Sequence, residues 1–184
     1  MRLLNVGCGM DQRGTDFLDI AKHHEKVVIC NVDKDRFPYS NETFEMIYAF
    51  HVIEHLTNTR HFMTECWRVL KYQGKMLLVT DNASFLPYHM PFKGSGAHDG
   101  YNSNDSNDKH FHIHTKQDII NLSSTFMFNV EQCGYCYNES VFGLAAPIPS
   151  IVQGLCYGIP ALWFPKYFET QIFAKLRKGP GDEE

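Results

Sequence analysis

A turn with two glycines lies within the first ten residues, directly after a short apolar run. Leu3–Val6 is typical of a buried parallel strand, and Gly7, Cys8 and Gly9 follow it. Because glycine lacks a Cβ, Gly7 and Gly9 let the backbone pass close to a ligand and adopt angles that other residues resist. In open α/β sheets, ligands bind outside the carboxyl ends of the strands, where this turn would lie. The turn is therefore a candidate nucleotide site, although two glycines alone are a common pattern.

Two residues whose side chains can take part in acid–base chemistry stand where later strands are expected to end. His51 follows the apolar stretch Phe44–Phe50, and Asp81 follows the stretch Lys75–Thr80. Both would lie at the edge of the sheet where ligands bind. Imidazole is suited to proton transfer at neutral pH, so His51 is the leading candidate for a general base and Asp81 is a second catalytic candidate.

A third group consists of His110, His112 and His114, which alternate along the chain. A strand would place the three imidazoles on one face. They could then be considered as Zn²⁺ ligands, but alternate positions on one strand lie too far apart to surround a single ion. We therefore expect a polar strand face near the ligand-binding edge of the sheet and no metal site.

Alternating strands and helices would position these residues. Apolar runs predict strands, and helical spacing predicts helices whose ends carry capping residues. The strands are expected at 3–6, 15–20, 27–32, 44–50, 75–80 and 129–137, and the helices at 51–56, 58–72 and 115–128. Thr115 and Asp118 form a capping-box pattern, and Gly74 is expected to end the preceding helix. The order predicts an α/β fold, a Rossmann-like doubly wound sheet, mostly parallel with an antiparallel edge strand and with helices on both faces.

Two stretches depart from this pattern. Residues 81–109 hold many Gly, Asn, Ser and Asp residues without periodicity, which indicates a long active-site loop. Residues 146–184 form an apolar, aromatic extension that is broken by prolines and ends in charged residues. Its aromatic and basic side chains suggest peripheral contact with a membrane, weighed against packing on the domain or on a second subunit. We expect one domain over 1–145 followed by this extension.

Composition excludes several classes of protein. The net charge of −4 over 184 residues gives no basic surface for nucleic acid. No long apolar run is free of Pro and Gly, so no transmembrane segment is expected. The chain has 6 Cys and begins without a signal peptide, so we expect reduced thiols and a cytoplasmic location. Gln12 stands where a third glycine would complete a dinucleotide motif, which disfavours a nicotinamide-dependent oxidoreductase.

Taken together, the motifs over residues 3–137 resemble those of class I S-adenosylmethionine-dependent methyltransferases of the small-molecule and sugar type. The resemblance is carried by the glycine turn and by four later segments in the family's order: Phe37-Pro38-Tyr39 with Asn41–Glu45, His51–Leu56, Trp67–Lys75, and His112–Thr115. It implies S-adenosylmethionine as cofactor and methyl transfer to an oxygen or nitrogen atom of a small-molecule or glycan acceptor, free or linked to a lipid. The alternative is a methyltransferase-fold protein that binds the cofactor, or acts as a scaffold, without turnover.

The resemblance also assigns roles to individual residues. Asn5, Gly7, Cys8 and Gly9 would pass under the methionine part of the cofactor, Ile20 and Lys34 would contact its nucleoside, and Phe50 and His51 would face the reactive methyl. The ribose diol calls for a carboxylate at the end of the second strand. Asp19 is preferred for the ribose, with Asp33 near the adenine amino group. If residues 15–26 formed a helix instead, Asp33 would hold the ribose.

Overall fold

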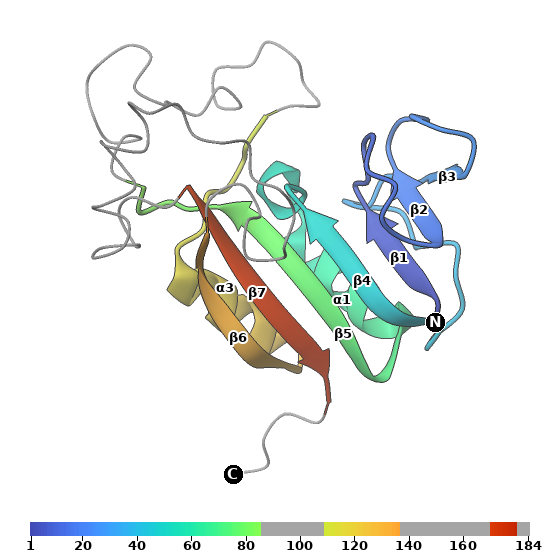
Figure 1. The fold of residues 1–184 in the computed structure, drawn as a ribbon. Coiled ribbons are helices and arrows are strands. Elements are labelled where there is room, and N and C mark those ends of the chain that lie inside the picture. The colour runs from blue at the N-terminus through green and yellow to red at the C-terminus, as the bar shows by residue number, and fades with distance from the viewer. Residues whose placement is uncertain (86–108, 137–169, 180–184) are drawn as a thin grey trace.

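A seven-stranded mixed sheet forms the centre of the protein (Figure 1). The computed structural model describes residues 1–85, 109–136 and 170–179. The strands run in the order β3-β2-β1-β4-β5-β7-β6. They are β1 (Leu3–Val6), β2 (Asp16–Asp19), β3 (Val27–Ile29), β4 (Phe44–Phe50), β5 (Leu70–Asp81), β6 (Phe128–Cys136) and β7 (Gln171–Lys178).

Pairing within the sheet is parallel from β3 to β5, and β7 runs antiparallel between β5 and β6. The predicted α/β fold class, mostly parallel with an antiparallel strand, is therefore confirmed. The antiparallel strand lies one position in from the edge, which β6 forms. Asp16–Asp19 is a strand and not part of a helix, so Asp19 ends the second strand as the preferred arrangement required.

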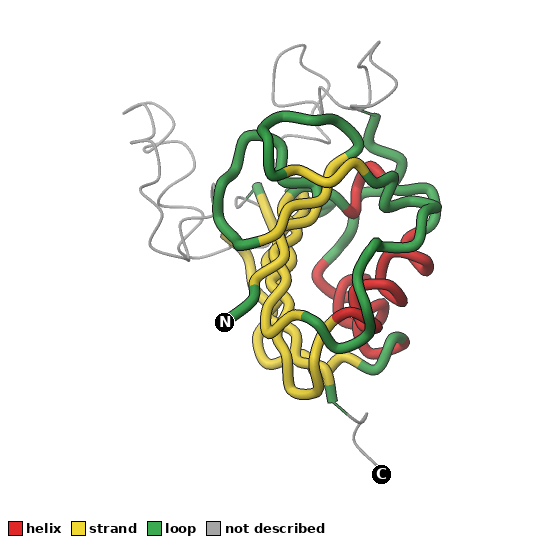
Figure 2. The backbone as a smooth tube through the Cα atoms, turned by 90° about the vertical axis from the view of Figure 1, so that its right-hand side faces the viewer, coloured by secondary structure: helices red, strands yellow, loops and turns green. Residues whose placement is uncertain are grey.

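Helices cover one face of the sheet in the part of the chain that the structure describes. They are η1 (Ile53–His55), α1 (Thr59–Val69) and α3 (Lys116–Thr125), and Figure 2 shows all of them on the same side. Helices on both faces were predicted, but the connections 7–15, 20–26 and 30–43 between the first four strands are loops. The first two are shorter than the dozen or so residues that a helical crossover needs.

The two longer helices begin with the caps expected from their sequences. The Asn58 side chain accepts a hydrogen bond from the backbone N–H of His61, and Thr115 and Asp118 form both bonds of a capping box. The predicted end of α1 at Gly74 is wrong. The helix ends at Val69, because the chain then joins the sheet and Leu70 pairs with Phe44 of β4.

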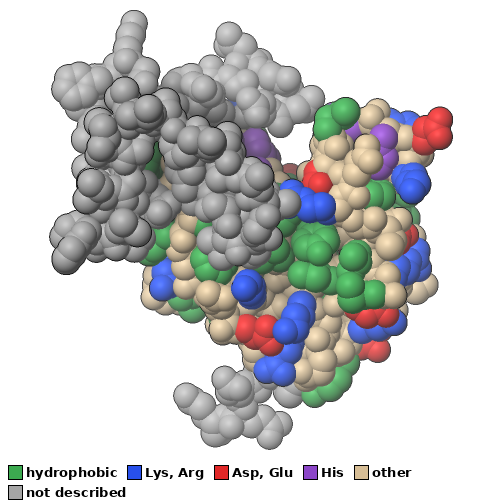
Figure 3. Space-filling view, viewed as in Figure 1, with side chains coloured by type: hydrophobic (Ala, Val, Ile, Leu, Met, Phe, Trp, Pro, Cys, Tyr) green, Lys and Arg blue, Asp and Glu red, His purple; other side chains and the backbone are tan. Residues whose placement is uncertain are grey.

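The main core lies between the sheet and the helices. Apolar residues of alternate strand positions, such as Val6, Ile47 and Leu78, face Phe62 and Cys66 of α1 in a cluster of fully buried side chains. Alternation places a second apolar cluster on the opposite face of the sheet, made of Phe50, Leu77, Val79, Cys136 and Phe173. Figure 3 looks onto this second face, where apolar side chains gather above a group of charged ones.

The last described strand, β7, alters the expected domain organisation. It pairs with β5 over seven residues and with β6 along its length, so Gln171–Lys178 belongs to the sheet that was expected to end before residue 146. Ile172 and Phe173 are 1% and 4% exposed and therefore cannot form a membrane-contacting surface. The other aromatic residues of the extension lie outside the described residues; they are Tyr157, Trp163, Phe164, Tyr167 and Phe168. No helix among the described residues is long and apolar enough to cross a membrane.

Candidate active site

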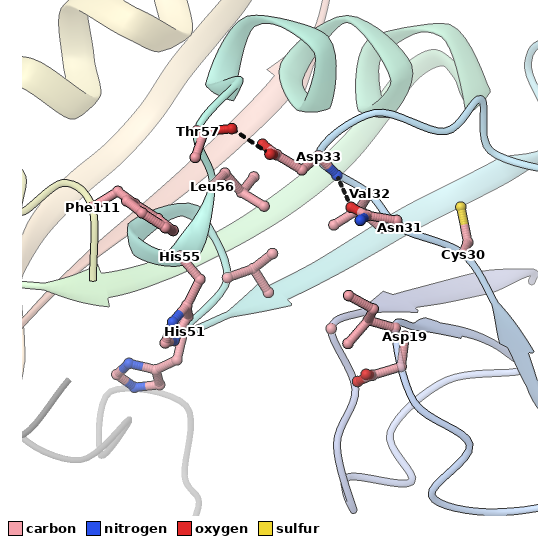
Figure 4. A pocket seen from close by; sticks show the side chains of 13 residues that line it. Asp19, Cys30, Asn31, Val32, Asp33, His51, His55, Leu56, Thr57 and Phe111 are labelled. Atoms are coloured by element: carbon pink, nitrogen blue, oxygen red, sulfur yellow. Dashed lines mark hydrogen bonds between the residues drawn. The ribbon is translucent and has the colours of Figure 1, made fainter. Parts of the chain in front are cut away.

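A pocket of about 370 Å³ opens where β1, β2, β3 and β4 end (Figure 4). Its volume falls within the range of small-molecule and cofactor sites. Four loops that follow parallel strands supply its walls, as expected for an open α/β sheet. The lining residues are Gly7, Asp19, Ile20, Cys30, Asn31, Val32, Asp33, His51, Val52, His55, Leu56, Thr57 and Phe111.

Gly7 brings the β1 loop into close contact with the β4 loop. Its φ is +63°, and a Cβ at this position would lie 2.4 Å from Cγ2 of Val52. Its backbone N–H donates to the carbonyl of Leu18 at 2.8 Å, which fixes the turn against β2. Gly9 also has a positive φ, of +50°, but no atom lies within 4 Å of its missing side chain. Glycine is thus required at residue 7 by both conformation and space, and at residue 9 by conformation only.

Asp19 joins the glycine turn to the end of β2. One carboxylate oxygen accepts the backbone N–H of Gly9 at 2.8 Å, and the other accepts the N–H of Ala21 at 3.0 Å. The residue is 8% exposed and lines the pocket. A carboxylate has about four lone-pair sites, so Asp19 can still accept hydrogen bonds from a ligand diol while it holds both loops.

Asp33 lies on the opposite wall of the pocket and holds the start of α1. Its carboxylate accepts the Thr57 hydroxyl at 2.5 Å and the backbone N–H of Asn58 at 2.6 Å. Its own N–H donates to the side chain of Asn31. Figure 4 shows the Asp33 carboxylate pointing toward Thr57 and Asp19 lying on the far side of the pocket.

His51 follows β4 in a backbone conformation that is rare for a residue with a side chain. Its φ is +53°, and such outliers are often found at functional sites. Its Nδ1 lies 3.0 Å from Oε1 of Glu54 and 3.7 Å from Oδ1 of Asp81, and its Nε2 lies 2.8 Å from Nε2 of Gln171. The two predicted catalytic residues, His51 and Asp81, are therefore brought together at the mouth of the pocket.

Glu54 and Gln171 are the members of this cluster that sequence reasoning missed as functional groups. Glu54 is absent from the predicted site residues, yet its carboxylate is fully buried and accepts the Thr80 hydroxyl at 2.9 Å. Its spacing of three residues from His51 in a helical segment was the available signal. Gln171 gave no such signal, because only the pairing of β7 with β5 brings it beside the end of β5.

Other predicted cofactor residues lie next to the pocket without lining it. Asn5 is 1% exposed and donates to Asp11 and to the carbonyl of Arg13. Burial raises the pKa of the Cys8 thiol to about 11, so the thiol stays protonated at neutral pH. Asn5 therefore organises the β1 loop, and Cys8 presents a neutral side chain.

Phe50 and Lys34 are also engaged elsewhere in the structure. The guanidinium of Arg13 lies 4.4 Å from the centroid of the Phe50 ring, in the position of a cation–π partner. The backbone N–H of Lys34 donates to the carbonyl of Asn31 at 3.1 Å and closes a turn. Neither residue is part of the pocket lining.

The three alternating histidines do not share a strand face, which corrects the prediction. Residues 109–113 form no strand, and His114 makes only an isolated bridge with Asn82. His110 instead places its Nδ1 3.3 Å from Oδ2 of Asp81. Burial lowers the pKa of His114, which favours its neutral form. The segment thus contributes one histidine to the cluster around Asp81.

Comparison with known proteins adds a family match and a set of similar folds. Residues 4–78 match a family model described as a methyltransferase domain. This match supports a class I S-adenosylmethionine-dependent methyltransferase. No curated protein matches the sequence.

Among solved structures, the chain resembles an S-adenosylmethionine-dependent methyltransferase from Archaeoglobus fulgidus, with a TM-score of 0.65 and 15% identity over 96% of this chain and 86% of that one. A second, from Mesorhizobium loti, has a TM-score of 0.64 and 13% identity over 96% and 90%. A third is phosphoethanolamine N-methyltransferase 2 of Haemonchus contortus in complex with S-adenosyl-L-methionine, with a TM-score of 0.60 and 15% identity over 97% and 48%. At these identities the likeness concerns the fold.

The family match and the fold support S-adenosylmethionine as the cofactor. The pocket at the carboxyl ends of the strands suits this cofactor. Gly7 allows the β1 loop to pack directly against Val52 in the pocket wall, and a buried carboxylate with spare acceptor capacity stands at the end of β2. The cofactor has no pyrophosphate, and the pocket-lining residues include no Lys or Arg. The residues that line this pocket therefore fit the chemistry of the cofactor.

Proposed function

We propose that the chain transfers a methyl group from S-adenosylmethionine to an oxygen or nitrogen atom of a small molecule or a saccharide, free or linked to a lipid. The observation that carries this proposal is the place of His51, which lines the cofactor pocket and also belongs to the cluster with Glu54 and Asp81. A hydroxyl acceptor must lose a proton as it is methylated, and these groups stand where that proton would leave.

Within the pocket, we assign the ribose to Asp19 and the adenine side to Asp33. Asp19 stands at the end of β2 and holds the glycine turn through Gly9. Its ionised carboxylate would accept both hydroxyls of the diol. Asp33 is tied to Thr57 and Asn58, so its first task is to hold that wall of the pocket. When bound, S-adenosylmethionine supplies an electrophilic methyl group.

Near the methyl position, His51 and Asp81 are the proposed catalytic residues. Both contact the acceptor or its proton in this proposal, whereas Glu54 orients His51 through its Nδ1. His51 has a positive φ at the end of β4 and lines the pocket. The acceptor class is inferred from this polar cluster, which is suited to a hydroxyl or amine.

The test is a binding titration of the purified chain with S-adenosylhomocysteine, using Asp19→Asn and Asp33→Asn as a matched pair. Loss of a hydrogen bond to a charged group costs about 1.5–3 kcal/mol, so Asp19→Asn should weaken binding by roughly 10- to 100-fold. Both substitutions remove bonds within the protein and should lower the free energy of unfolding, but Asp33→Asn should weaken binding less, because only Asp19 is assigned to the ribose hydroxyls. Absence of binding by the unmodified chain would refute the proposal.

Turnover is tested separately with S-adenosylmethionine labelled in its methyl group. The chain is incubated with fractions of a cell extract and with simple hydroxyl, amine and saccharide acceptors, and label transfer is followed with His51→Ala as the control. Transfer that His51→Ala abolishes while binding remains supports an enzyme. Binding without transfer to any fraction would favour a cofactor-binding protein without turnover.

A further inference from the structure

Three side chains from three different elements converge beside the cofactor pocket. His51 follows β4, Glu54 lies in η1 and Asp81 ends β5, and one ligand atom of each lies within 4.8 Å of the others. The Nδ1 of His51 lies 3.0 Å from Oε1 of Glu54 and 3.7 Å from Oδ1 of Asp81. Ligands placed 2.0–2.2 Å from a tetrahedral cation are about 3.4 Å apart. The distances from Nδ1 of His51 to the two carboxylate oxygens therefore lie just below and just above the distance expected between two ligands of one metal ion.

Each carboxylate also has a second neighbour. Oε2 of Glu54 accepts the Thr80 hydroxyl at 2.9 Å, whereas Oδ2 of Asp81 lies 3.3 Å from Nδ1 of His110 as an ion pair without a hydrogen bond. One Glu54 oxygen therefore faces the centre of the cluster while the other is fixed from outside. This two-layer arrangement is characteristic of metal sites, in which outer hydrogen bonds orient the ligands.

The imidazole of His51 follows the same pattern. Its Nδ1 faces the carboxylates and its Nε2 lies 2.8 Å from the side-chain amide of Gln171. In the cation-free protein, a proton on Nδ1 would bind Oε1 of Glu54. A cation would take the place of this proton on Nδ1, and the proton of the imidazole would then be on Nε2. After a flip of the Gln171 side-chain amide, Nε2–H would donate to its oxygen. Metal binding that displaces a proton is the general rule for histidine ligands.

Charge points in the same direction. The side chain of Glu54 is fully buried, and burying a carboxylate is costly unless a positive group balances it. Its carboxylate contacts His51 and Thr80, and the imidazole of His114 also interacts with it electrostatically. Asp81 adds a second carboxylate close by. A divalent cation would balance both.

We propose that His51, Glu54 and Asp81 bind a divalent transition-metal cation such as Zn²⁺ or Mn²⁺, with the methyl acceptor's hydroxyl at a remaining coordination position. One imidazole and two carboxylates suit these ions better than Mg²⁺ or Ca²⁺. Three protein ligands leave a position open, as in catalytic metal sites. The cation would polarise the hydroxyl and ease the loss of its proton to water. This inference rests on the proposed function, and in it His51, Glu54 and Asp81 act on the acceptor through the cation and not by direct contact with its proton.

The full chain is first treated with a chelator and then titrated with ZnCl₂ or with MnCl₂ in separate calorimetric experiments. The metal content of each sample is then measured after dialysis. We expect one equivalent of metal per chain. Asp81→Asn and Glu54→Gln should each weaken binding by more than about 100-fold, because even outer-layer substitutions cost 10- to 100-fold. Glu65→Gln is the matched control. It removes another buried carboxylate, which binds Arg68 and the N–H of Phe37 away from the cluster, and should leave metal affinity unchanged.

Absence of metal binding by the unmodified chain would overturn the proposal. Equal metal binding by the Asp81→Asn variant would also overturn it and would place the metal on other histidines. Asp81 is partly exposed, so Asp81→Asn keeps the test usable if Glu54→Gln does not fold. Titration of the same samples with S-adenosylhomocysteine tests the proposed function independently. A chain that binds S-adenosylhomocysteine but no metal would contradict this inference alone.

Discussion

Substitution of Gly7 by alanine tests how the β1 loop makes room for the cofactor. The residue has a φ of +63°, and the new Cβ would lie 2.4 Å from Cγ2 of Val52. Gly9 has a φ of +50°, but no atom lies within 4 Å of the place that its Cβ would take. Gly9→Ala is therefore a matched control, because it imposes the same kind of backbone strain without a collision.

The two variants should differ by the cost of the collision. A residue with a Cβ in the left-handed region costs about 1–2 kcal/mol, which applies to both. Overpacking of a well-packed site costs about a further 1–3 kcal/mol, which applies only to Gly7→Ala. We expect the free energy of unfolding to fall by about 1–2 kcal/mol in Gly9→Ala and by about 2–5 kcal/mol in Gly7→Ala.

Urea denaturation of the two variants, together with Val52→Ala and the double variant, measures this difference. Without Cγ2, the nearest remaining atom of residue 52 is its Cβ at 3.5 Å, an ordinary contact. The double variant should therefore lose about 1–3 kcal/mol less than the sum of the single variants. Equal stability of Gly7→Ala and Gly9→Ala, or strict additivity with Val52→Ala, would refute the reasoning.

Three further predictions concern ionisation and helix ends. Burial lowers the pKa of His114 below its usual 6.5, so the unfolded chain binds its proton more readily, and the free energy of unfolding should fall as pH drops from 7 to 5.5. The His114→Gln variant should show a shallower fall in urea titrations across that range, and an identical slope would contradict this. Burial raises the pKa of the Cys30 thiol to about 11, so iodoacetamide at pH 7.5 should label it in the native protein far more slowly than in urea, as mass spectrometry would show. Thr115→Ala removes the hydroxyl that accepts the backbone N–H of Asp118 in the α3 capping box, and leaves the bond from its own N–H to the Asp118 carboxylate. It should lower the midpoint of thermal unfolding by an amount equivalent to about 1 kcal/mol, whereas Thr64→Ala on the exposed side of α1 should change it little.

The strands near the site could be predicted because their signals are local. Phe44–Phe50 is a strand with the predicted bounds, and Asp19 ends β2 as preferred from the sequence. Apolar runs that end at a glycine or an acidic residue mark buried parallel strands directly. The caps of α1 and α3 are equally local, since they depend on residues three apart.

Long-range pairing could not be predicted in the same way. Gln171–Lys178 contains an apolar alternation, but nothing in it indicates insertion between β5 and β6. That pairing brings Gln171 to His51, so one neighbour of the cluster of His51, Glu54 and Asp81 depends on contacts 120 residues apart in sequence. Helix ends also depended on the sheet, because α1 stops at Val69 where Leu70 finds a strand partner.

The histidines show the same limit. Their alternation suggested a strand face, whereas the chain from 109 to 113 forms no strand and only His110 reaches Asp81. The importance of Glu54 was hidden for a related reason. A glutamate in a helical segment is usually exposed, and its complete burial follows from the packing of η1 against the end of β5, where Thr80 lies.

A crystal structure of the chain with S-adenosylhomocysteine bound would locate the ribose, the adenine and the sulfur in the pocket. We expect both ribose hydroxyls to donate to the carboxylate of Asp19, the adenine to lie on the side of Asp33, and the sulfur to face His51. Ribose hydroxyls bound to Asp33, or a ligand seated away from the wall formed by Gly7 and Val52, would contradict this assignment.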